Sequence, residues 1–191
     1  MTPKEVTAQV FELYAKFGAN DYIGEPVSQL EHMSQATQLA MQEGFDDEVV
    51  LAAFLHDVGH LCTSRNSEND MNGFGIKSHE KIGADYLRGL GFPERIAALV
   101  ESHVEAKRYL CFVQPEYMAK LSEASQETLK LQGGVMTAAE AEHFERNPLH
   151  KLMVKMRLWD DLAKETHQGL VDFDLLKRKM ESVLKQTFAG A

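Results

Sequence analysis

Hydrophobic residues recur along this chain at intervals of three and four, the spacing that places them on one face of an α-helix. Val6, Val10, Leu13 and Phe17 form the first such stripe, and Gly18 ends it. Prolines, glycines and capping residues separate the later stripes in the same way. The pattern predicts helices over residues 6–17, 26–44, 46–55, 78–91, 93–110, 115–121, 122–132, 148–161 and 172–188, and one that begins at the capping box of Thr137 and Glu140.

No stretch alternates between apolar and polar residues for long enough to predict a β-strand. A polar loop rich in Asn, Ser and Gly, residues 63–77, separates two of the predicted helices. The chain has 191 residues, which is enough for one hydrophobic core and short for two. It shows no repeat, linker or low-complexity tract. We therefore expect an all-α fold with a single domain over residues 1–191.

The composition excludes several classes of partner. The hydrophobic fraction of 44% is ordinary for a globular protein, and the formal net charge is −9. That charge argues against a nucleic-acid surface and against an anionic membrane. Residues 1–17 lack the apolar core of a signal peptide, and no run of about 18 apolar residues could span a bilayer. Cys62 and Cys111 form no metal or redox spacing, so we expect a cytoplasmic protein with reduced thiols.

The strongest chemical signal is His-Asp-Val-Gly-His at residues 56–60. Val49, Ala53 and the two histidines follow helical positions i, i+4, i+7 and i+11, so an apolar stripe turns into imidazoles at its end. Asp57 lies about a quarter turn away, near enough to share a metal ion with the first histidine. Gly59 removes a side chain where the backbone must turn.

Three more histidines, His32, His79 and His103, stand at positions that the pattern turns towards the core. His32 shares a stripe with Ala36, His79 directly follows the predicted cap Ser78, and His103 continues an apolar stripe. Each one alone is more readily a hydrogen-bonded core residue than a ligand. Four neutral imidazoles gathered in one core with an aspartate have few other reasons to exist, so we expect a metal site.

Periodicity distinguishes two neighbouring aspartates near the end of the chain. Asp160 shares a stripe with Met153 and Met156 and is predicted to point inward. Asp161 falls at helical spacing with Arg157 and is predicted to be a solvated ion-pair partner. Because a buried carboxylate is costly unless it binds a cation, we expect Asp160 to be a metal ligand.

The expected ligand set is His32, His56, Asp57, His79, His103 and Asp160. Four histidines and two aspartates without cysteine disfavour structural zinc and oxygen-rich calcium or magnesium cages, and they suit iron or manganese. If Asp57 bridges, it would hold two ions a few ångströms apart, which predicts a dinuclear centre in the core.

The order of these ligands resembles the metal pattern of the HD superfamily. Beyond the ligands, longer segments of the sequence are similar to the HD-domain mixed-valent di-iron oxygenases that cleave organophosphonates. This similarity covers roughly residues 21–160. The matching segments are Asp-Tyr-Ile-Gly-Glu at 21–25, Gln-Leu-Glu-His at 29–32, His-Glu-Lys at 79–81, Gly-Ala-Asp-Tyr-Leu-Arg-Gly-Leu-Gly at 83–91 and Ala-Lys-Arg-Tyr-Leu at 106–110.

This resemblance implies a single HD domain with its metal core over about residues 21–161. It implies two iron ions, Fe(II) and Fe(III), with O₂ as co-substrate and a small organophosphonate as substrate. His32, His56, Asp57 and Asp160 would hold one iron, and Asp57, His79 and His103 the other. The implied reaction converts (1-hydroxy-2-aminoethyl)phosphonate to glycine and phosphate, after a separate hydroxylase has installed the 1-hydroxyl.

Candidate substrate contacts come from helical spacing and from the family resemblance. Lys107 lies four residues after one predicted ligand and Arg157 three before another, so each can face a phosphonate near the metal. The resemblance implies further contacts from His60 and Ser125. It also implies a mobile lid, in which Tyr22 covers an iron site until substrate arrives and Glu25 binds the substrate amine. The predicted catalytic residues are Tyr22, Glu25 and His60.

Four alternatives share some of these features. An HD phosphohydrolase uses similar ligands but needs neither O₂ nor a lid tyrosine. An oxygenase resembling inositol oxygenase would act on a polyol, and a non-catalytic HD module would need a partner domain. A carbon–phosphorus oxygenase for the trimethylammonio analogue would favour an aromatic cage around its substrate, whereas Glu25 suits a primary ammonium.

Overall fold

The protein is described by a computed structural model that covers residues 1–22 and 24–190. Ile23, part of the motif at 21–25, and Ala191 lie outside the described residues. The helices are α1 (Pro3–Phe17), α2 (Gln29–Gln42), α3 (Asp47–Leu55), α4 (Gly59–Cys62), α5 (His79–Gly89), α6 (Glu94–Val113), α7 (Pro115–Met118), α8 (Glu123–Leu131), α9 (Ala138–Glu145), α10 (His150–Leu162) and α11 (Phe173–Ala189). The described residues contain no strand, only two isolated bridges, which confirms the all-α expectation.

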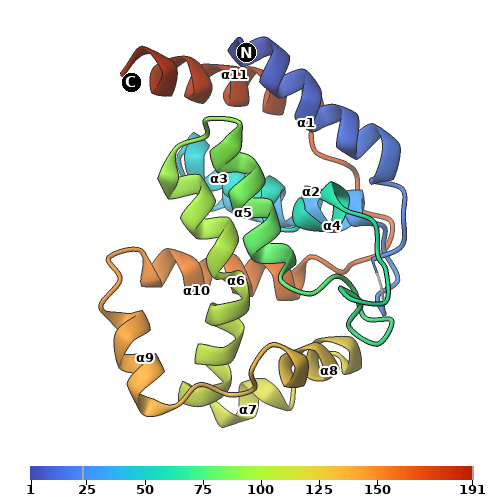
Figure 1. The fold of residues 1–191 in the computed structure, drawn as a ribbon, viewed down its shortest axis with the longest axis vertical. Helices are drawn as coiled ribbons and strands as arrows, with labels where there is room; N and C mark the ends of the chain where they lie inside the picture. Colours follow the sequence, from blue (N-terminus) through green and yellow to red (C-terminus); the bar gives the residue numbers. More distant parts are fainter. Residues whose placement is uncertain (23, 191) are drawn as a thin grey trace.

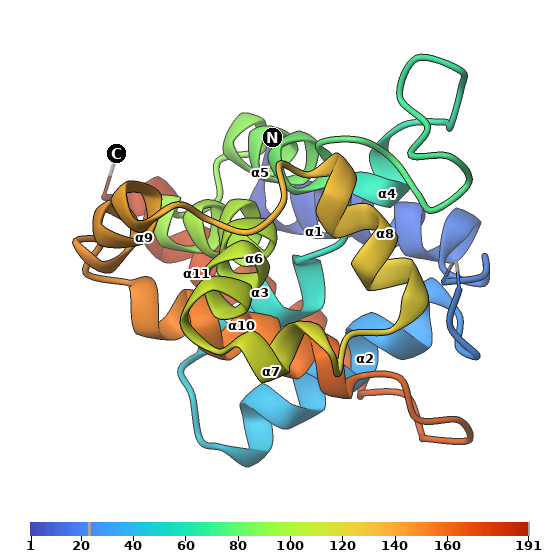
Figure 2. The ribbon, with the colours of Figure 1, turned by 90° about the horizontal axis from the view of Figure 1, so that it is seen from below.

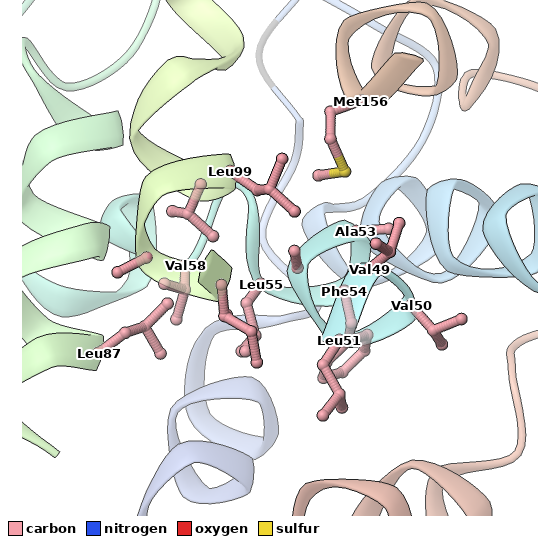
Figure 3. Packing of buried hydrophobic residues seen from close by; sticks show 14 of the residues in the cluster. Val49, Val50, Leu51, Ala53, Phe54, Leu55, Val58, Leu87, Leu99 and Met156 are labelled. Carbon is pink, nitrogen blue, oxygen red and sulfur yellow. The ribbon is translucent and has the colours of Figure 1, made fainter. Parts of the chain in front are cut away.

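Helix α3 is the centre of the core. Asp46 caps its first turn by accepting from the Val49 amide, and every residue from Val49 to Leu55 is buried. A helix that is apolar on all sides must be surrounded by others. Figure 3 shows this packing, with Leu87 of α5, Leu99 of α6 and Met156 of α10 around α3. The His-Asp-Val-Gly-His motif at residues 56–60 begins immediately after this buried helix.

Helices α1 and α11 lie at one end of the molecule, and α7, α8 and α9 lie at the other. Figure 1 shows α1 and α11 side by side at the end that carries both termini, and they pack together. Tyr14 of α1 stacks on Phe54 of α3 with 4.4 Å between ring centroids, and its hydroxyl donates to the Phe54 carbonyl at 2.7 Å. The long helix α6 runs from α5 to the opposite end, where α7, α8 and α9 lie. Figure 2 shows the same helices from below.

Two predicted helix starts are corrected. Helix α2 begins at Gln29 rather than at residue 26, because Ser28 and Glu31 form a capping box with each other's backbone amides. Ser78 does precede α5, but its backbone is left-handed with φ of 58° and its side chain makes no capping bond.

The turn after α3 also differs from the expectation. Residues 56–58 form a turn, so His60 lies on the separate helix α4 and does not continue the stripe of Val49 and Ala53. His56 does continue it, and it is buried. No helix in the described part of the chain is long and apolar enough to cross a membrane.

Candidate metal centre and adjoining cavity

The four buried histidines have their tautomers fixed by the backbone. Each Nδ1 lies within hydrogen-bond distance of a main-chain carbonyl, and since a carbonyl only accepts, each Nδ1 carries the proton. The acceptors are Ala163, Ala53, Ile76 and Val100 for His32, His56, His79 and His103, at 2.8, 2.9, 3.1 and 2.8 Å. Each Nε2 is therefore left with a lone pair, as a metal ligand needs.

These lone pairs face each other in two pairs. His32 Nε2 lies 3.0 Å from His56 Nε2, and His79 Nε2 lies 2.9 Å from His103 Nε2. With both protons on Nδ1, neither pair has a hydrogen to share. Two nitrogens bound at right angles to one ion, with bonds of about 2.1 Å, lie roughly 3 Å apart. The observed separations therefore suit two cations, one at each pair.

Asp57 joins the two histidine pairs. Its Oδ2 lies 3.6 Å from His32 Nε2 and 3.5 Å from His56 Nε2, while its Oδ1 lies 3.4 Å from both His79 and His103 Nε2. The two oxygens of one carboxylate thus face different pairs. Asp160 completes the first group, with Oδ1 3.4 Å from His32 Nε2. All six predicted ligands are brought together in the geometry expected for a bridged dinuclear centre.

The charge of the cluster also fits a cation. Burial raises the pKa of Asp57, but the neighbouring His56 and His79 lower it by more. The pKa of this carboxyl therefore lies well below its ordinary value. The carboxylate is 2% exposed, and no Lys or Arg in the described chain forms an ion pair with it. A buried carboxylate that stays ionised is costly without a positive partner, and a bound cation would supply one. Imidazole and carboxylate donors fit iron, manganese or zinc.

A close backbone contact positions the second histidine pair. A Cβ at Gly59 would lie 1.9 Å from the His79 carbonyl oxygen and 2.9 Å from the Gly83 amide nitrogen. Gly59 therefore lets α4 meet the start of α5, which fixes His79 beside Asp57. The sequence analysis attributed the glycine at position 59 to a turn of the backbone. The structure adds this steric reason for it.

A cavity of about 70 Å³ adjoins the centre. It is lined by all of the predicted catalytic and substrate-binding residues, namely Tyr22, Glu25, His60, Lys107, Ser125 and Arg157. It is also lined by Asp57, His79, His103 and Asp160 of the candidate metal centre. One buried water needs at least about 10–15 Å³ of such space, so the cavity holds several water-sized groups.

Three polar groups make one wall of this cavity suited to an anion. Lys107, which is 2% exposed, donates to Thr128 Oγ1 at 3.0 Å and to the Ser125 carbonyl at 3.4 Å. Burial, together with the charge of Arg157, lowers the pKa of Lys107 to about 7. Ser125 Oγ accepts from Arg157 Nη2 at 3.2 Å and keeps its own hydrogen to donate.

Arg157 is less free than its position in the sequence suggested. Its Nε donates to Tyr117 Oη at 3.0 Å, its Nη1 to Asp160 Oδ2 at 2.6 Å, and its Nη2 to Ser125 and Asp161. Four of its five N–H groups are thus used, and one on Nη1 remains. The arginine therefore offers a phosphonate a charge and one hydrogen bond, which is too few for a two-pronged contact.

Asp161 is not the solvated residue that the periodicity predicted. Its pairing with Arg157 is present, but the side chain is only 20% exposed and also accepts from the Tyr117 hydroxyl. The reason is that α7 covers this side of α10 through Tyr117, which sequence spacing within one helix does not reveal. Tyr117 and Asp161 together hold Arg157 in place.

Tyr22 and His60 cover the two histidine pairs. The Tyr22 ring stacks on His32 with 3.9 Å between centroids, and its hydroxyl donates to Asp160 Oδ1 at 3.4 Å. Burial raises the pKa of Tyr22 well above its ordinary value. His60 stacks on His79 at 4.0 Å. Burial and the neighbouring His79 lower the pKa of His60 to about 3, so it is a neutral acceptor beside the cavity.

The structure adds one charged residue that the sequence reasoning missed. Lys164 Nζ lies 2.8 Å from Glu25 Oε1, and both side chains line the cavity. Lys164 lies beyond the end of α10 at Leu162, so helical spacing from Asp160 does not place it, and no signal in the sequence indicated its pairing with Glu25.

The geometry agrees with a match to a known family. The sequence pattern described as HD domain matches residues 29–164, which include all six candidate ligands. The chain belongs to the HD-domain family. Its HD motif is His56-Asp57 at the end of α3.

Three relatives are similar over most of their length. Uncharacterized protein L432 of Acanthamoeba polyphaga mimivirus is 42% identical over 93% of this chain and 81% of its own. The [1-hydroxy-2-(trimethylamino)ethyl]phosphonate dioxygenase (glycine-betaine-forming) of Leisingera caerulea is 41% identical, over 84% and 81%. The hydroxymethylphosphonate dioxygenase of Gimesia maris is 39% identical, over 97% and 92%.

Proposed function

We propose that this protein is an O₂-dependent dioxygenase that cleaves the carbon–phosphorus bond of a small 1-hydroxyphosphonate. The observation that carries the proposal is the two facing histidine pairs bridged by Asp57, beside a cavity lined by the hydrogen-bond donors Lys107, Arg157 and Ser125. Two relatives of about 40% identity bear the names of phosphonate dioxygenases, which supports the same chemistry here. We further propose that the centre binds two iron ions in the mixed Fe(II)/Fe(III) state.

The proposed stoichiometry needs no external reductant. (1-Hydroxy-2-aminoethyl)phosphonate plus one O₂ contains the same atoms as glycine plus phosphoric acid. The C1–P bond breaks, C1 is oxidised to the carboxyl carbon, and O₂ is the electron acceptor. Hydroxymethylphosphonate and O₂ balance in the same way to give formic acid and phosphate. The substrate must carry a hydroxyl at C1, so a separate hydroxylation reaction is expected to supply it.

When bound, the iron ions would supply O₂ activation and a Lewis acid for the substrate oxygens. The residues of the chain would bind and orient the substrate. Lys107, Arg157 and Ser125 each offer one donor to the phosphonate from the same wall of the cavity. His60, neutral and stacked on His79, offers an acceptor for a substrate hydroxyl or a protonated phosphonate oxygen. Fixed donors of this kind hold C1 at one place beside the centre.

The lid tyrosine has a distinct role in the proposal. Because Tyr22 lies over His32 and bonds to Asp160, it covers one half of the centre. We expect this cover to slow unproductive oxidation of the metal ions. Tyr22→Phe keeps the ring but loses the bond to Asp160, so its mixed-valent EPR signal should decay faster in air than that of the wild type.

The lining of the cavity bears on the substituent that C1 carries. Glu25 lies on that lining and offers a carboxylate to a substrate ammonium group. A quaternary ammonium also prefers several aromatic rings around it. Among the described residues, only Tyr22 and Phe74 line the cavity with a phenyl or phenol ring. We propose the aminoethyl compound as substrate, with the trimethylammonio analogue as the weaker alternative.

The test is a panel of substrates assayed for phosphate release with and without O₂. The panel contains the hydroxymethyl, hydroxyaminoethyl and hydroxytrimethylammonioethyl phosphonates and one phosphate monoester. We expect O₂-dependent release from at least one hydroxyphosphonate and none from the monoester. Hydrolysis of the monoester without O₂ would instead establish an HD phosphohydrolase.

A further inference from the structure

Lys164 lies at the cavity without a part in the mechanism proposed above. It follows α10 directly, next to Ala163, whose carbonyl accepts from His32 Nδ1. Its Nζ is 2.8 Å from Glu25 Oε1, and the two side chains are only 18% and 10% exposed. The Glu25 carboxylate, which the resemblance assigns to the substrate amine, therefore already has the ammonium group of Lys164 beside it.

Glu25 belongs to a short segment, the lid, which we define as residues 21–22 and 24–28. Tyr22 attaches this segment to the core, because its ring stacks on His32 and its hydroxyl donates to Asp160. Within the lid, the Tyr22 amide donates to the Val27 carbonyl at 2.9 Å and the Glu25 amide to the Tyr22 carbonyl at 3.0 Å. Gly24, with φ of +81°, touches α8, where an added Cβ would lie 2.6 Å from Ala124 Cβ. The Glu25–Lys164 pair joins the lid to the end of α10.

We propose that Lys164 is a specificity-determining residue that holds the lid closed and competes with a cationic substrate for Glu25. This inference rests on the proposed function, because it concerns the substituent on C1 of a hydroxyphosphonate. Two cations in one poorly solvated space repel each other, and one carboxylate cannot bind both equally well. A substrate ammonium must therefore displace Lys164, whereas an amine-free hydroxyphosphonate leaves the pair intact.

The first experiment compares two substrates in Lys164→Gln. This change keeps the side chain polar and removes the competing charge. Relative to the wild type, the ratio of kcat/KM for the hydroxyaminoethyl compound to that for hydroxymethylphosphonate should rise about threefold to tenfold. Lys155→Gln is the matched control, since it removes the ion pair between Lys155 of α10 and Glu43 at the end of α2 and should leave the ratio unchanged. Equal changes for both substrates in Lys164→Gln would overturn the competition.

The second experiment does not depend on activity. Hydrogen exchange of the Tyr22 and Gln29 amides reports opening of the lid, because they donate to Val27 and Asn20 within and beside it. Exchange should rise about threefold to tenfold in Lys164→Gln and in Glu25→Gln, and the double variant should show no more than either alone. Wild-type exchange rates in Lys164→Gln would overturn the closing role. If the wild type cleaves neither phosphonate but the exchange result holds, the proposed function fails while the ion pair is confirmed.

Discussion

Replacement of Lys107 by Met should weaken substrate binding and stabilise the fold at the same time. The ammonium group is 2% exposed, and burial lowers the pKa of Lys107 from 10.5 to about 7. At about 1.4 kcal/mol for each pKa unit, its charge destabilises the folded state by at most roughly 5 kcal/mol. Thr128 Oγ1 donates to the Ser125 carbonyl at 3.2 Å, so it keeps a partner after the substitution.

The pH dependence of this effect has a definite sign. Because the pKa of Lys107 is lower in the folded than in the unfolded chain, the unfolded chain binds more protons between about pH 7 and pH 10.5. The destabilisation is therefore complete below about pH 7 and fades as the pH rises towards 10.5. Lys107→Met should gain about 1–4 kcal/mol at pH 7, with Tm higher by about 2–4 °C for each kcal/mol, and less at pH 9.5.

The assay combines thermal unfolding at the two pH values with phosphonate kinetics. Loss of a charge-assisted bond to the phosphonate costs about 1.5–3 kcal/mol, so KM should rise about tenfold to a hundredfold with unchanged metal content. Lys120→Met, at an exposed lysine, is the control and should change neither quantity. A destabilised Lys107→Met with normal KM would show that the lysine is structural and would refute the reasoning.

Three further predictions follow from the centre and its supports. Asp57→Ala should lower the metal content from two ions to less than one per chain by mass spectrometry, and retention of one full equivalent would argue against a bridging carboxylate. Asp161→Asn weakens the hold on Arg157, so phosphonate KM should rise about threefold to tenfold without metal loss; an unchanged KM would restore the sequence-based view of a silent position. Gly59→Ala cannot fit against the His79 carbonyl, so urea unfolding should show a loss of more than about 2 kcal/mol, and wild-type stability would contradict the close contact.

The helical pattern and the burial of the candidate ligands could be predicted because both depend on short-range periodicity. His32, His103 and Asp160 continue apolar stripes of their own helices, and those stripes must face the core. The structure brings all six ligands together as that logic requires. The all-α class could be predicted for the same reason.

The remaining features depend on contacts between helices that spacing within one helix does not encode. Asp161 is covered by Tyr117 of α7, and Lys164 is paired with Glu25 of the lid, 139 positions away. Ser78 precedes α5 in a left-handed conformation that its residue type does not signal. Asp161 and Lys164 thus have partners from distant segments, whereas the difference at Ser78 concerns the conformation of its backbone.

The central claim is most directly tested by admitting O₂ to an anaerobic mixture of the iron-loaded protein and (1-hydroxy-2-aminoethyl)phosphonate. Phosphate, glycine and dissolved O₂ are then measured in the same sample. The proposed function predicts no phosphate before O₂ is admitted and, afterwards, one phosphate and one glycine for each O₂ consumed. Phosphate release under anaerobic conditions, or O₂ consumption without phosphate, would contradict it.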